Sequence, residues 1–68
     1  MQNIIKVTEV NKDTPTLIGV NQIISVKDCK LKDNGITTSC SEIKTIGAMV
    51  STFFVYESVD SIYTMINN

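Results

Sequence analysis

The chain has 68 residues, a formal net charge of −1 and a hydrophobic fraction of 43%. A fold of this length buries only about 60% of the surface that its unfolded chain exposes, so we expect one domain, residues 1–68, that gains stability by self-association. The chain has no His and only two Cys, which argues against a metal or cofactor site. All six basic residues are Lys, whereas nucleic-acid binders usually carry Arg in a basic stripe.

The sequence contains no segment that predicts export or membrane insertion. Residues 1–10 hold one Lys and no apolar run long enough for a signal peptide. The longest apolar stretch, residues 48–56, is interrupted by Ser51 and Thr52 and is far shorter than the roughly 20 residues of a membrane helix. We therefore expect a cytoplasmic protein without membrane contact.

Three strands are predicted in the first half of the chain, because β-branched residues there alternate with turn-forming clusters. Ile5 and Val7 fall on the same face of the first strand. The predicted segments are strands over residues 3–10, 16–20 and 23–31, a turn over residues 11–15, and an interruption at residues 21–22.

Asn34-Gly35 is the clearest local signal, because a two-residue type I′ hairpin loop needs positive φ at both positions. With this loop Leu31 faces Thr38, and Cys29 faces Cys40. We expect one face of the hairpin to be buried, the one that carries Cys29, Leu31, Ile36, Thr38 and Cys40. The other face carries Asp28, Lys30, Lys32, Thr37, Ser39 and Ser41.

Farther from the loop the alternation reverses, since Val26 and Ile43 pair on the face that is polar near the loop. One extra residue in a strand exchanges its two faces. The pattern therefore predicts a β-bulge near residues 27–28 or 41–42.

Gly47 supplies the next turn, and residues 49–56 form a last strand that is apolar on both faces. Ser58 is a predicted helix N-cap. The helix that follows, to about Asn67, carries an apolar stripe of Val59, Ile62, Tyr63 and Ile66. The predicted fold is α+β: a small antiparallel β-meander of about four or five strands with one short C-terminal helix packed on the sheet.

Cys29 and Cys40 occupy a hydrogen-bonded pair of the predicted register, at which the α-carbons lie within disulfide distance. In a reducing cytoplasm the expected state is two small buried thiols. A disulfide remains the alternative.

The sequence offers no catalytic constellation. The best candidate for a catalytic base with a partner is Lys44 or Lys27 beside Glu42. An exposed cross-strand ion pair is a better interpretation of these residues than a catalytic pair. Among the acidic residues, Asp13 and Asp33 fall in turns and Asp60 at the helix start, where each has an ordinary structural role. The three glycines are scattered singly. We expect a protein that is not an enzyme.

The apolar last strand predicts an interface, because exposed apolar patches on small domains mark partner surfaces. One face would pack on the helix and the other on a second subunit or another protein partner. In the alternative interpretation the sheet folds over within one chain and these residues are core. The predicted interface residues are Met49, Phe53, Val55 and Tyr56.

A second functional hypothesis is a nucleic-acid-binding sheet, with Tyr56 or Phe53 as a stacking platform. Its basic face would carry Lys27, Lys30, Lys32 and Lys44.

The order of elements resembles the FlbD-like family of small bacterial proteins linked to flagellar function and swarming, and related short bacterial and phage proteins. The resemblance lies in residues 5–8, 17–26 and 55–62, with Glu57-Ser58-Val59 as its most specific part. Residues 29–49 are longer than in the family pattern, so motility is not transferred. The resemblance implies a non-enzymatic protein that acts by contact, without catalytic residues.

Overall fold

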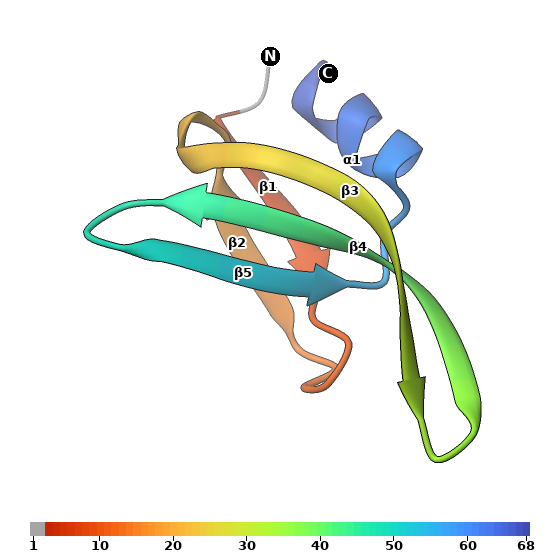
Figure 1. The fold of residues 1–68 in the computed structure, drawn as a ribbon. Coiled ribbons are helices and arrows are strands. Elements are labelled where there is room, and N and C mark those ends of the chain that lie inside the picture. Colours follow the sequence, from red (N-terminus) through yellow and green to blue (C-terminus); the bar gives the residue numbers. More distant parts are fainter. Residues whose placement is uncertain (1–2) are drawn as a thin grey trace.

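The computed structural model describes residues 3–68 and shows five strands followed by one α-helix (Figure 1). The first two residues of the predicted domain 1–68 lie outside the described part. The small antiparallel α+β fold expected from the sequence is confirmed. Its elements are β1 (Ile4–Thr8), β2 (Pro15–Gly19), the 3₁₀ turn η1 (Val20–Gln22), β3 (Ile23–Asp33), β4 (Ile36–Ile46), β5 (Val50–Val55) and α1 (Val59–Ile66).

The strands form two antiparallel sheets, one of β1 and β2 and one with the order β3-β4-β5. Figure 1 shows the β1–β2 hairpin behind the three-stranded sheet. The sheets meet where β1 ends beside the end of β5: Glu9 pairs with Val55, the amide of Val10 donates to the carbonyl of Phe54 (2.9 Å), and the amide of Tyr56 donates to the carbonyl of Thr8 (2.9 Å). The two sheets are therefore joined at one corner and enclose the space between them.

The core fills this space and draws on both sheets and the helix. Ile5 and Val7 are both buried. The prediction that they share one face of the first strand is therefore confirmed, and this face points into the core. Val26, Phe53, Met65 and Ile66 pack at its border. The buried core cluster consists of Ile5, Val7, Ile18, Ile43, Val55 and Ile62.

The β3–β4 hairpin has the predicted register, with Leu31 opposite Thr38 and Cys29 opposite Cys40. Asn34 and Gly35 have φ values of 52° and 79°, as a type I′ loop requires. Residues 30–39, called the arm below, pair only with each other and contain no buried side chain. In Figure 1 the arm projects away from the body of the protein.

Two expectations for this hairpin are corrected. The register runs without a break through residues 25–33, and the irregularity lies between Ile23 and Ser25, not near residues 27–28 or 41–42. The buried face changes at Cys40 and Ser41, which are consecutive and both buried, because the strand pair twists and bends there (Figure 1). Ile36, expected on the buried face, is 68% exposed because the arm extends beyond the core.

The helix begins as predicted at Ser58, whose hydroxyl oxygen accepts a hydrogen bond from the Ser61 amide at 3.0 Å. Ile62 is its buried anchor. Tyr63, expected in the apolar stripe, is 68% exposed, so the packed face of the helix is narrower than predicted. No helix within residues 3–68 is long and apolar enough to cross a membrane.

Candidate interaction surface

The four predicted interface residues divide between the core and the surface. Val55 is 0% exposed and lies in the chain's own core, which corrects the expectation that it contacts a partner. Phe53 is half-buried against the same core. Met49 and Tyr56 are exposed. For Val55 and Phe53 the structure thus agrees with the alternative in which the sheet folds over within one chain.

The register of β4 and β5 explains this division. Val55 pairs with Ser41, and Phe53 pairs with Ile43, so both side chains share the core side of the sheet. Val50, Thr52 and Phe54 alternate with them and lie on the outer side. One apolar face of the strand therefore belongs to the core, and the other apolar face remains outside it.

Three exposed apolar side chains lie together where β4 turns into β5. Ile46, Met49 and Val50 are 53%, 74% and 58% exposed, and Ile46 pairs directly with Val50. We call residues 46–50 the apolar turn. Sequence reasoning named only Met49 here, although a signal was available: Ile46-Gly47-Ala48-Met49-Val50 lacks the Asn, Asp and Ser usual in exposed turns.

The two edge strands of the three-stranded sheet differ in charge. The strand β5 contains no charged residue, and the uncharged stretch continues from Thr45 to Tyr56. Charged side chains on an edge strand discourage pairing with another chain. The edge of β3 has this protection, because it carries Lys27, Asp28, Lys30, Lys32 and Asp33.

Part of the β5 edge has no neighbouring strand within residues 3–68. The carbonyl of Phe54 points toward β1, where it accepts the Val10 amide. Because backbone groups of alternate residues point to the same side of a strand, those of Thr52 and Val50 face the same direction, beyond the reach of β1. They are free to pair with an added strand.

The lysines of the nucleic-acid hypothesis do not share one face. Lys27 pairs with Glu42 and Lys44 with Ser25, positions on one face of the β3–β4 ladder. Lys30 and Lys32 occupy alternate positions and belong to the opposite face. The sequence did not predict this division, because a bulge was expected near residues 27–28 or 41–42. Such a bulge would have exchanged the two faces of the hairpin between these lysines.

Tyr56 is attached to the β1–β2 turn. Its hydroxyl donates to the carbonyl of Val10 at 3.1 Å. The nearby carboxylate of Asp13 favours the protonated hydroxyl and raises the pKa of Tyr56 above its ordinary value. These contacts reduce the freedom of the ring to act as the stacking platform considered above.

Glu57 connects three elements just before the helix. One carboxylate oxygen accepts the Thr8 amide at 2.9 Å, and the other accepts the Thr8 hydroxyl at 3.2 Å. The backbone carbonyl of Glu57 accepts the hydroxyl of the buried Ser41 at 2.7 Å. These bonds hold β1 and β4 against the segment that leads into α1, so the role of Glu57 is structural.

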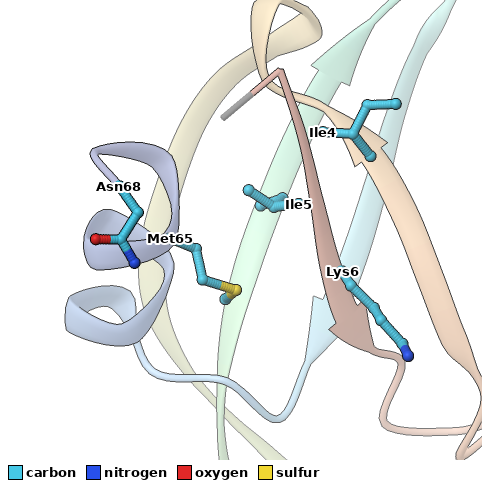
Figure 2. A pocket seen from close by; sticks show the side chains of 5 residues that line it. All are labelled: Ile4, Ile5, Lys6, Met65 and Asn68. Carbon is cyan, nitrogen blue, oxygen red and sulfur yellow. The ribbon is translucent and has the colours of Figure 1, made fainter. Parts of the chain in front are cut away.

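A small cavity of about 190 Å³ lies between β1 and α1. In Figure 2, Ile5 and Met65 point toward each other across this space, whereas Ile4 and Lys6 extend from the other side of the strand. Asn68 completes the lining. The part of the chain described here contains no group of three or more His, Cys, Asp or Glu residues that could hold a metal ion.

Comparisons of the chain with protein-family models, curated proteins and solved structures gave no match. The resemblance to the FlbD-like family therefore stays a prediction.

Proposed function

We propose that the protein is a small non-enzymatic interaction module that self-associates through β5 and the apolar turn. The observation that carries the proposal is the exposure of Ile46, Met49 and Val50 at one end of the sheet. Removing apolar surface from water contributes about 25 cal/mol per Å². A contact that covers these three side chains therefore supplies stability that a 68-residue chain has little other means to gain.

A second copy of the chain is the occupant that suits this surface. Two β5 strands related by a two-fold axis can pair antiparallel along residues 50–52, because the same backbone groups are free on each. Such an interface is self-complementary, and it brings the two apolar turns close to each other. The uncharged stretch from Thr45 to Tyr56 supports this arrangement, since no like charges meet across the axis. We propose the cytoplasm as its location, in keeping with a chain that has only two Cys.

The test is the mass in solution, measured by light scattering at several protein concentrations. We expect at least twice the chain mass of 7.5 kDa at high concentration. Val50→Asp places a charge at the centre of the proposed contact and should give a folded monomer. Circular dichroism of the variant shows whether it remains folded.

The matched control is Leu17→Asp, because Leu17 is also an exposed apolar strand residue but lies on the β1–β2 sheet. This variant should retain the mass of the unmodified protein. A monomer at all concentrations, or equal loss of mass in both variants, contradicts the proposal. A rise in mass only with a single-stranded oligonucleotide at low salt would instead support the nucleic-acid hypothesis.

A further inference from the structure

Cys29 and Cys40 lie directly opposite each other on β3 and β4, and both are free thiols. Counted from the two-residue loop, they occupy a hydrogen-bonded position of the ladder, where α-carbons are about 5.5 Å apart. Disulfides join residues whose α-carbons are about 4.4–6.8 Å apart. The backbone thus holds the two cysteines within the separation that a disulfide needs.

The two thiols differ in access to solvent. Cys29 is half-buried, whereas Cys40 is only 5% exposed. Burial, together with the adjacent Cys29 thiol, raises the pKa of Cys40 to about 11. A surface hollow of about 360 Å³ lies beside the pair and is lined by Asp28, Cys29, Lys30, Ser39 and Cys40. A reagent that enters this hollow therefore meets Cys29 as the more exposed thiol.

The pair also stands at a structural boundary. Ser41, next to Cys40, is fully buried on the core side of β4. On the other side of the pair, residues 30–39 form the arm, which contains no buried side chain. A covalent bond at this position would fix the two strands where the arm leaves the body.

We propose that Cys29 and Cys40 form a reversible cross-strand disulfide that fastens the base of the arm. The Cys29 thiolate attacks a low-molecular-weight disulfide such as oxidised glutathione, forming a mixed disulfide and releasing one thiolate. Cys40 then loses its proton to solvent and attacks the Cys29 sulfur, which releases the second thiolate. The two cysteines lose two electrons and two protons, and the small disulfide is reduced to two thiols.

The test is an equilibrium in mixtures of reduced and oxidised glutathione, stopped with acid and analysed by mass spectrometry. Oxidised monomer is identified by a loss of about 2 Da and by the cross-linked peptide. The measurement is repeated in urea that unfolds the chain. We expect the equilibrium constant for the disulfide to be at least about tenfold larger in the folded protein, because the register holds the thiols together.

An equal or smaller constant in the folded protein would overturn the proposal, and so would a product that carries only glutathione adducts. By linkage, the oxidised protein should also melt higher than the reduced protein, by roughly 5 °C or more. An unchanged or lower melting temperature counts against it.

Single variants test the assigned order of the thiols. Cys40→Ser should accumulate a glutathione adduct on Cys29, because the mixed disulfide has no second thiol to resolve it. Cys29→Ser should remain unmodified while folded, because Cys40 is buried. Equal adduct formation in the two variants contradicts the assignment of Cys29 as the attacking thiol.

Discussion

Glu57 shows how a single side chain can join elements that are far apart in the sequence. Its bonds reach Thr8, 49 residues earlier, and Ser41, 16 residues earlier. The sequence showed Glu57 just before a helix N-cap, but a local pattern contains no information about distant partners. The hydroxyl of Ser41 is satisfied by this contact, and no buried side-chain polar atom within residues 3–68 lacks a partner.

Glu57→Gln tests this role. The substituted amide can keep its oxygen on the Thr8 amide and turn its NH₂ group to the Thr8 hydroxyl, which then accepts. Both bonds lose the negative charge that strengthens them. We expect the free energy of unfolding in urea to fall by about 1–3 kcal/mol. Asp60→Asn is the control, because Asp60 is exposed in the first helical turn and should cost only about 0.3–1 kcal/mol. Equal losses in the two variants would show that the Thr8 contacts contribute little.

The elements differ in how far the sequence could predict them. The register of β3 and β4 was predictable because Asn34-Gly35 fixes it locally. The exposure of Ile36 was not, because it depends on how far the core extends along the hairpin. No local pattern marked the irregularity between Ile23 and Ser25. The division of β5 between core and surface likewise depends on which face meets the first sheet. Local turn chemistry therefore determined the pairing, and long-range packing determined the burial.

The arm should be nearly dispensable for stability. Deleting residues 31–32 and 37–38 removes two cross-strand pairs, Leu31–Thr38 and Lys32–Thr37. The Asn34-Gly35 loop and the faces of the remaining residues are kept. Because the arm buries no side chain completely, we expect the free energy of unfolding to change by less than about 1 kcal/mol. Ile43→Ala, within the core part of the same hairpin, should cost about 2–5 kcal/mol. A deletion as costly as Ile43→Ala would mean that the arm helps to hold the body together.

The stability of the whole molecule depends on one small core, to which both sheets and the helix contribute side chains. Its members come from β1, β2, β4, β5 and α1, and a backbone bridge joins the two sheets at Glu9 and Val55. A chain of this length has a free energy of unfolding of roughly 3–10 kcal/mol. Loss of one core contact should therefore weaken both sheets together, and unfolding should be a single cooperative transition.

Ile62→Ala tests whether both sheets unfold together when a core residue of the helix is truncated. Ile62 is 1% exposed, and its truncation leaves a cavity between the helix and the sheets, so we expect a loss of about 2–5 kcal/mol. Tyr63→Ala, one position along on the exposed side, should change stability by about 0.5 kcal/mol or less.

Both variants are measured by urea unfolding at low protein concentration, because self-association adds concentration-dependent stability. Circular dichroism reports the strands, and tyrosine fluorescence reports Tyr56 at the junction of the sheets together with Tyr63 on the helix. Coincident midpoints in Ile62→Ala are the expected result, whereas an earlier midpoint for one probe would show that the sheets hold their structure separately.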